Sequence, residues 1–120
     1  LLSETGPLDA LVTPLGGGGL TCGSALVAAA RGGAAVFGAE PAGAPDAYES
    51  LRQGRHVTDL VPDTVCDGLR ATVGAPNLAL MRQLGVQALL ASDEEVVAAM
   101  RLLWSRLKQV VEPSAAIALA

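Results

Sequence analysis

The sequence predicts an α/β fold with a parallel sheet, and three consecutive stretches carry that prediction. Residues 10–15 are a short apolar run typical of a buried strand. Residues 20–31 are rich in alanine and predict a helix, and residues 35–39 return to a strand pattern. A strand, a helix and a second strand form a βαβ unit, whose strands pair in parallel through a right-handed crossover.

The middle of the chain continues the alternation less clearly. Gly32-Gly33 stands where the first helix is expected to stop, and Glu40-Pro41 is expected to end the second strand. Residues 46–53 predict a short helix. Residues 55–76 lack periodicity and predict extended loops, with one short strand near residues 64–66.

The last third contains the best-defined helix. A helix over residues 77–84 and a strand over residues 86–91 precede it. Ser92 and Glu95 have the spacing of a capping box, which marks a helix start. Apolar residues then recur at helical spacing and predict one buried stripe: Val96, Met100, Leu103, Leu107 and Val110.

Composition excludes several classes of protein. Of the 120 residues, 51% are hydrophobic and 17% charged, which is typical of a globular domain. The net charge of −4 and only three aromatic residues argue against nucleic-acid binding. No apolar run is long enough to span a membrane. Cys22 and Cys66 form no metal-type pair, so we expect free thiols in a reducing cytoplasm.

Both ends of the chain look cut. The sequence opens on Leu1-Leu2 without the pattern of a signal peptide, and residues 115–120 are an apolar helical run without a C-cap. We therefore expect residues 1–120 to be a single partial domain of a longer protein. Such a piece is expected to self-associate or to be marginally stable.

Four consecutive glycines, Gly16-Gly17-Gly18-Gly19, separate the first strand from the first helix. Glycine loses more backbone entropy on folding than other residues, so this run needs a turn with positive φ or a close approach of the backbone to a ligand. In a strand–loop–helix arrangement, amide groups and the helix N-terminus converge on an anion. The run therefore predicts a phosphate-binding loop.

Two common phosphate motifs do not fit. A dinucleotide fingerprint needs a glycine at the sixth position, where Thr21 or Cys22 stands. A Walker A loop needs a lysine after its second glycine, but Ser24 follows Gly23. Nucleoside triphosphate hydrolysis is therefore a poor fit, and no G-x-S-x-G or H-E-x-x-H motif occurs.

Residues 11–20 resemble the tetraglycine loop of serine racemase and the serine/threonine dehydratases, which are fold-type II enzymes that use pyridoxal 5′-phosphate (PLP). Three further segments match in order: Phe37-Gly38-Ala39-Glu40-Pro41, Asp67-Gly68-Leu69 and Glu112-Pro113-Ser114-Ala115. The resemblance covers nearly the whole chain. It implies that the α/β fold is part of a large domain like that of the tryptophan synthase β subunit.

The resemblance also implies roles for particular residues. The backbone amides of Gly16, Gly17, Gly18, Gly19 and Leu20 would hold the cofactor phosphate. Gly68 would lie against the pyridine ring, and Glu112 near the edge of the cofactor. An ordinary turn glycine and a solvated carboxylate at a helix end are the alternative interpretations of Gly68 and Glu112.

A cation site is implied at Glu40, Ala44 and Asp46, which match the positions of a hard-cation site in serine racemase. Two carboxylates and a backbone carbonyl suit Mg²⁺ or Ca²⁺, with water completing the coordination. The alternative is that Glu40 belongs to a solvated loop and that Asp46 caps a helix.

The residues that would complete the chemistry are missing. The family uses a lysine that forms a Schiff base with PLP, and the only lysine here, Lys108, is expected on a solvated helix face. The serine-rich segment that binds the pyridine nitrogen and the small substrate domain are also absent. His56 is expected at the surface.

The function implied by the resemblance is that of the PLP-binding portion of an enzyme acting on β-hydroxy amino acids such as serine, threonine or 3-hydroxyaspartate. The enzyme would eliminate water to give a keto acid and ammonia, or racemise its substrate, as a homodimer. We expect the isolated chain to be inactive. The alternatives are a non-catalytic phosphate- or nucleotide-binding module and an inert, self-associating fragment.

Overall fold

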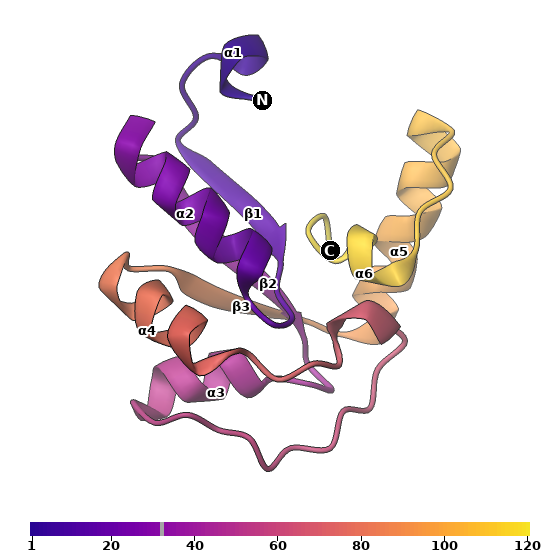
Figure 1. Cartoon of the computed structure of the whole chain (residues 1–120). Coiled ribbons are helices and arrows are strands. Elements are labelled where there is room, and N and C mark those ends of the chain that lie inside the picture. The colour runs from indigo at the N-terminus through magenta and orange to yellow at the C-terminus, as the bar shows by residue number, and fades with distance from the viewer. Residues whose placement is uncertain (32) are drawn as a thin grey trace.

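A three-stranded parallel sheet forms the centre of the molecule in a computed structural model that describes residues 1–31 and 33–120 (Figure 1). Its strands lie in the order β1 (Ala10–Pro14), β2 (Ala35–Pro41) and β3 (Gln87–Ala91). Leu11 pairs with Val36, and Phe37 pairs with Gln87. The α/β class and the parallel βαβ unit predicted from the sequence are therefore confirmed.

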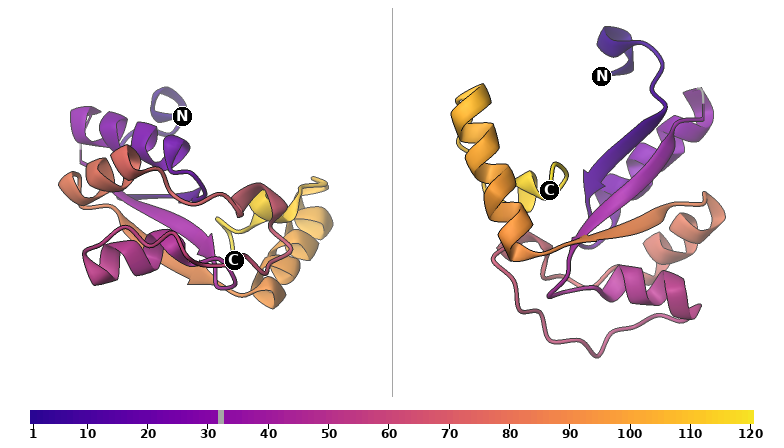
Figure 2. Two further views of the ribbon diagram at one scale, coloured as in Figure 1. Left: turned by 60° about the horizontal axis from the view of Figure 1, so that its bottom comes forward. Right: turned by 180° about the vertical axis from the view of Figure 1, so that it is seen from behind.

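Three helices contribute to the larger of two apolar cores. They are α2 (Gly19–Arg31), α3 (Asp46–Gln53) and α4 (Ala75–Gln83). Their buried side chains meet Leu15 and Val36 of the β1–β2 region. Figure 2 shows α2 and α4 side by side on one side of the sheet. This core positions the glycine loop, because the loop joins β1 to α2.

The smaller core lies at the carboxyl ends of β2 and β3. It joins Ala39 and Ala91 of the sheet to α5 (Asp93–Leu102) and to α6 (Pro113–Ala116). A 3₁₀ turn over Asp67–Leu69 contributes Leu69 to the same cluster. This second core therefore brings the segments around residues 68 and 112 to the end of the sheet where the glycine loop begins.

The first strand is less buried than its apolar sequence predicts. Only Thr13 is fully buried within β1, and Val12 is 37% exposed. The physical reason is that β1 is an edge strand of this sheet. The larger core covers one face of the sheet, and the smaller core covers only the carboxyl-terminal end of the other face. Leu89 of β3 is exposed for the same reason.

The predicted stripe on the fifth helix is wrong beyond Leu103. The helix changes to a π-helical turn over Leu103–Leu107, and Lys108 ends it with a φ of 57°. Leu107 is 62% exposed and Val110 is 87% exposed. A π turn inserts an extra residue, so the side chains after it rotate away from the buried face.

Other local predictions divide between correct and wrong. The capping box is confirmed, because Ser92 Oγ accepts from Glu95 N and Glu95 Oε2 accepts from Ser92 N. The strand expected near residues 64–66 does not form, because Asp93 holds this segment by accepting from Thr64 Oγ1 and Val65 N. The second strand runs on through Pro41 instead of ending before it.

The remaining features are local. A short helix, α1 (Leu2–Thr5), precedes the sheet. Gly33 has the positive φ expected of a helix stop and donates to Ala28 O, whereas Gly32 lies outside the described residues. Within the part of the chain that the structure covers, no helix has the length and apolarity needed to cross a membrane.

Candidate phosphate and cofactor site

The glycine loop leads directly into the N-terminus of α2. Leu15 is fully buried and extends the pairing of β1, because its amide donates to Ala39 O over 2.8 Å. Cys22 N donates to Gly18 O over 2.9 Å, which is the first main-chain bond of the helix. The amides of Gly19, Leu20 and Thr21 precede that bond, so the helix offers them no acceptor. These amides form the positive end of the helix dipole.

Gly17, Gly18 and Gly19 differ in what a side chain would meet at their positions. Gly18 has a φ of 92°, and a Cβ on it would lie 2.9 Å from Asn77 Cβ, so packing alone requires glycine there. A Cβ on Gly17 or Gly19 would meet no atom within 4 Å. Packing does not explain glycine at these two positions. The open space beside them is what a closely approaching phosphate needs, so the loop fits the group.

The structure brings Gly68 and Glu112 to the same loop. A Cβ on Gly16 would lie 3.5 Å from Gly68 O, and a Cβ on Gly68 would lie 4.0 Å from Glu112 Oε1. Gly68 N also donates to Ser114 Oγ over 3.0 Å. Residues from three distant segments therefore surround one point at the carboxyl end of the sheet, which is the usual ligand position in α/β folds.

Gly68 has a packing reason besides the one that the resemblance implies. A Cβ on it would lie 3.0 Å from Ser114 Oγ, so a side chain would press on Ser114 whether or not a cofactor ring is bound. Glu112 is exposed and precedes α6 as its N-cap residue. The solvated interpretation of Glu112 therefore agrees with its exposure in this chain.

Glu40, Ala44 and Asp46 are all buried around the start of α3. The Glu40 carboxylate is 1% exposed and accepts from Ala47 N over 2.9 Å and from Tyr48 N over 2.8 Å. The solvated-loop alternative for Glu40 is therefore wrong. Asp46 does not cap the helix either, since its Oδ2 accepts from Val73 N over 2.7 Å.

The electrostatics of this pair are unusual. Burial raises the pKa of Glu40 to about 8, even though two backbone amides donate to it, and the nearby charge of Asp46 adds to the rise. Burial also raises the pKa of Asp46. Across residues 1–31 and 33–120, no cluster of three or more histidine, cysteine or acidic side chains forms a metal site. A cation here would need the Ala44 carbonyl and water as further ligands.

The other titratable residues singled out in the sequence are Lys108, His56 and the two cysteines, and of these His56 lies near enough to Asp46 for its charge to lower the pKa of that carboxyl. Lys108 is exposed at the end of the π turn, and its Nζ donates to Ser105 O over 2.7 Å. His56 is exposed, as expected, but its Nε2 lies 2.8 Å from Val73 O. Cys22 and Cys66 are free and buried, as the sequence predicts, and burial raises the pKa of both thiols.

Sequence reasoning missed two residues that hold the site together. Asn77 Nδ2 donates to Gly17 O over 2.7 Å, and Ser114 Oγ accepts from Gly68 N. Ser114 stands in a segment that the resemblance had already marked. Asn77 follows a proline, which in the sequence signals the start of a helix. That signal does not reveal a hydrogen-bond partner 60 residues away.

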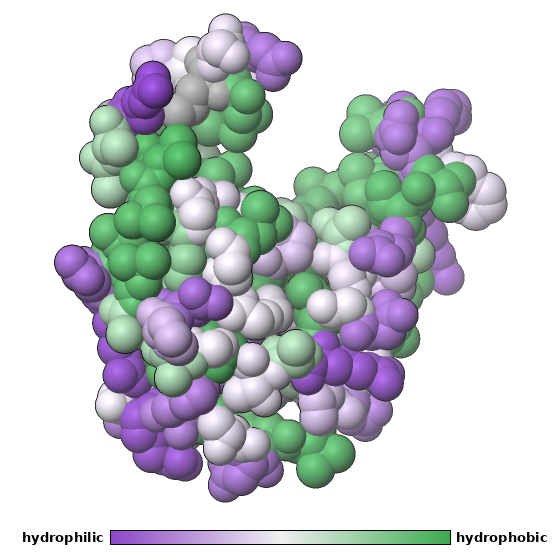
Figure 3. Space-filling view, in the orientation of Figure 1, coloured by the Kyte–Doolittle hydropathy of each residue, from purple (hydrophilic) through white to green (hydrophobic). Residues whose placement is uncertain are grey.

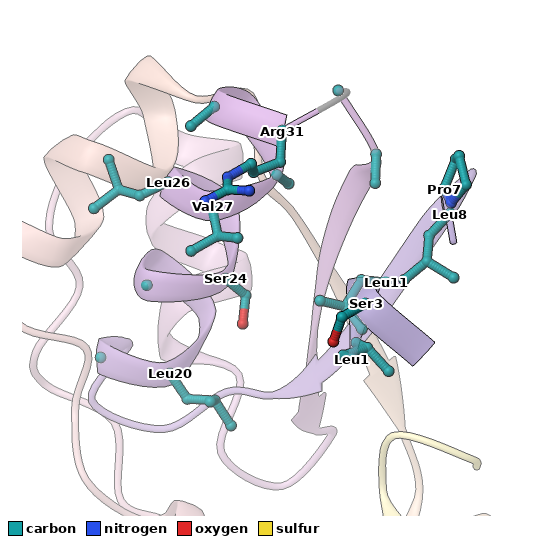
Figure 4. Close-up of a pocket in the computed structure, with 16 residues that line it drawn as sticks. Leu1, Ser3, Pro7, Leu8, Leu11, Leu20, Ser24, Leu26, Val27 and Arg31 are labelled. Atoms are coloured by element: carbon teal, nitrogen blue, oxygen red, sulfur yellow. The ribbon is translucent and has the colours of Figure 1, made fainter. Parts of the chain in front are cut away.

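An apolar hollow of about 860 Å³ lies next to the glycine loop. Leucine side chains from the N-terminal segment and the outer side of α2 line it, with Arg31 at its rim (Figure 4). Gly19 and Leu20 belong to its lining, so one end reaches the glycine loop. Figure 3 shows apolar surface along α2. The lining of this hollow has few polar groups, so it suits contact with apolar side chains better than binding of an amino acid.

Curated relatives match the whole length of this chain. The chain is 40% identical to a serine racemase of Dictyostelium discoideum, with 100% of this chain and 38% of that protein covered. It is 43% identical to L-threo-3-hydroxyaspartate ammonia-lyase of Saccharomyces cerevisiae, covering 100% of this chain and 37% of the relative. The chain therefore spans less than two fifths of the length of these relatives.

Solved structures agree with the sequence relatives. Maize serine racemase superposes with a TM-score of 0.90 at 35% identity, covering 99% of this chain and 38% of that chain. The processed form of threonine deaminase isoform 2 from Solanum lycopersicum gives a TM-score of 0.93 at 28% identity, over 98% of this chain and 33% of that one. The family model described as "Pyridoxal-phosphate dependent enzyme" matches residues 1–120. Because that match covers every residue, the chain belongs to the family of pyridoxal-phosphate dependent enzymes.

Proposed function

We propose that this chain is the cofactor-phosphate-binding portion of an enzyme that acts on a β-hydroxy amino acid. The enzyme either eliminates water, with release of a keto acid and ammonia, or racemises the substrate. One observation carries the proposal: the loop leaves open space beside Gly17 and Gly19, at the start of a helix whose first amides have no acceptor in the helix. The names of the relatives, which include racemases and hydroxyaspartate lyases, support the reaction class.

Backbone groups of the chain would bind and orient the cofactor. The amides of residues 16–20 would hold the phosphate, and the positive end of α2 would favour its charge. Gly68 and Glu112 would line the ring, because Gly68 lies next to Gly16 and Glu112 lies beside Gly68. When bound, PLP supplies the electron sink that stabilises negative charge at the substrate α-carbon.

The base that moves the α-proton is not supplied by this chain. Lys108 lies at a helix end and its ammonium group is engaged with Ser105 O. The reactive amine and the groups that bind the substrate carboxylate would come from other parts of the parent protein, since the relatives are much longer. We therefore expect no release of pyruvate from serine by the 120-residue chain alone.

A divalent cation, Mg²⁺ or Ca²⁺, is part of the proposal. It would bind Glu40, Asp46 and the Ala44 carbonyl. The support is chemical: burial and the nearby charge of Asp46 both raise the pKa of Glu40, and a cation would offset the cost of holding two charged carboxylates there. We further propose a cytoplasmic location, in keeping with two free cysteines, and a homo-oligomeric parent enzyme.

A ligand titration tests the proposed function. The chain is titrated with PLP, pyridoxal, inorganic phosphate and ADP, followed by absorbance for the first two and by amide NMR shifts of residues 16–20 for all four. PLP and phosphate should shift these amides, and pyridoxal and ADP should not. A response to ADP with none to PLP would favour a nucleotide-binding module. No response to any of the four would overturn the proposal.

A further inference from the structure

The carbonyl oxygen of Gly17 is held by the beginning of helix α4. It accepts from Asn77 Nδ2 over 2.7 Å and from Gly74 N over 3.1 Å. Gly74 is the N-cap residue of α4 and offers no side chain to cap it. The Gly17 carbonyl therefore lies at the positive end of α4, just as the loop amides lie at the start of α2.

This anchoring fixes the direction of the next amide. All peptide bonds in the described residues are trans. In a trans peptide the carbonyl and the following N–H point in opposite directions. With the Gly17 carbonyl aimed at α4, the Gly18 N–H must point away from α4. Without that anchor, a peptide between two glycines could rotate and present its carbonyl to the anion.

Asn77 touches the loop region in two further ways. Its Cβ lies 2.9 Å from where a Cβ on Gly18 would stand. Its main-chain oxygen accepts from Cys22 Sγ over 3.3 Å, which joins α4 to the first turns of α2. One side chain and its backbone therefore fix both ends of the Gly18 region.

We propose that Asn77 is a positioning residue for phosphate binding. Its side-chain amide holds the Gly17–Gly18 peptide in the orientation that offers the Gly18 N–H to the anion. Asn77 itself does not bind the phosphate. This role rests on the proposed function, because it matters only if the loop binds a phosphate group.

The test compares four variants of the chain. Asn77→Leu keeps the side-chain size without the donor, and Asn77→Ala removes the side chain but favours the helix. Asn77→His restores a ring N–H, Nδ1, at the position of the lost amide nitrogen. Gln83→Ala is the matched control, since Gln83 is an exposed amide side chain in the same helix.

Affinity is measured with inorganic phosphate and PLP, and the Gly18 amide shift is followed by NMR. We expect both dissociation constants to rise at least about tenfold in Asn77→Leu and Asn77→Ala, which is the loss of roughly one hydrogen bond. Asn77→His should recover most of the affinity, and Gln83→Ala should match the unaltered chain. A purely structural role would not give this rescue at unchanged stability.

The outcomes separate the two proposals. If the unaltered chain binds neither phosphate nor PLP, the proposed function fails. If it binds both and a folded donor-less variant binds them equally well, the positioning role of Asn77 is wrong. Asn77→Ala and Asn77→Leu perturb packing differently. The affinity of the parent chain is compared with that of whichever variant has the parent's melting curve in circular dichroism. If neither variant folds, the Asn77→His variant decides the question. A phosphate-induced shift of its Gly18 amide equal to that of the parent chain supports the positioning role, and the absence of that shift overturns it.

Discussion

Gly68 N donates to Ser114 Oγ over 3.0 Å, across 46 residues of sequence. Ser114 is 5% exposed, so its hydroxyl replaces water as the partner of this amide. The bond ties the turn over Asp67–Leu69 to the start of α6, and it sets the distance between the two segments that would flank a cofactor ring.

Replacing Ser114 should therefore destabilise the fold. In Ser114→Ala the Gly68 amide loses its acceptor, and we expect the free energy of unfolding to fall by about 1–2 kcal/mol. Urea denaturation measures the change. Ser105→Ala is the control, because the exposed Ser105 hydroxyl bonds only to its own helix, and it should have a much smaller effect. Equal losses in the two variants would contradict the importance of the bond.

Gly18→Ala should be the most damaging substitution in the glycine loop. Its φ of 92° is unfavourable for alanine, and the new Cβ would stand 2.9 Å from Asn77 Cβ. We expect a loss of about 1–3 kcal/mol in the free energy of unfolding, measured in urea. A Gly18→Ala chain as stable as the parent would mean that the loop has a different conformation.

Gly19→Ala should behave in the opposite way. A Cβ there meets no protein atom within 4 Å, and Gly19 is the first residue of α2, where alanine favours the helix. The melting temperature should stay the same or rise slightly. Phosphate and PLP affinity should still fall, because the methyl group would fill the space that we assign to the phosphate. Unchanged affinity would show that the anion does not approach Gly19.

Local sequence patterns were sufficient to predict the secondary-structure elements that surround the candidate site. The glycine run between an apolar strand and an alanine-rich helix predicts the β1–loop–α2 unit, and the capping box at Ser92 predicts the start of α5. These patterns depend on neighbours within a few residues. The error after Leu103 has the same origin: the apolar spacing continues to Val110, but the π turn and the left-handed Lys108 end the helix first.

Partners distant in sequence could not be predicted in this way. The bond between Asn77 and Gly17 joins residues that become neighbours only when α4 packs beside α2. Likewise, Glu40 is polar and next to Pro41, which resembles a loop, yet the fold buries it under the first turn of α3. Tertiary packing decides both cases.

We expect the buried acidic pair to make the stability of the fold depend on pH and, through the proposed cation site, on Mg²⁺ or Ca²⁺. Glu40 has an ordinary pKa of 4.5 in the unfolded chain and a pKa of about 8 in the fold. Its contribution to stability is therefore fully present below pH 4.5 and is lost as the pH rises through 8. With EDTA present, the melting temperature should fall over this interval.

Added Mg²⁺ or Ca²⁺ should restore the melting temperature, most strongly near pH 8, because the cation binds the ionised carboxylates. Glu40→Gln should lose the response to the cation and most of the pH dependence, and Asp46, whose pKa is also raised by burial, should supply what remains. Glu94→Gln removes the same charge at an exposed position and should retain both. A parent chain that melts at the same temperature with and without cations at this pH would argue against the metal site.

Both cysteines should be unreactive while the chain is folded. Cys66 is fully buried and Cys22 is 4% exposed, and burial raises the pKa of both thiols, so little thiolate is present at neutral pH. Labelling with a disulfide reagent should then require opening of the fold and proceed far more slowly than in denaturant. Single Cys22→Ser and Cys66→Ser variants assign each rate.

Phosphate should slow the labelling of Cys22 further, because a ligand at the start of α2 stabilises the closed state. Labelling of Cys22 at the unfolded rate would mean that this helix does not stay closed over its thiol in solution.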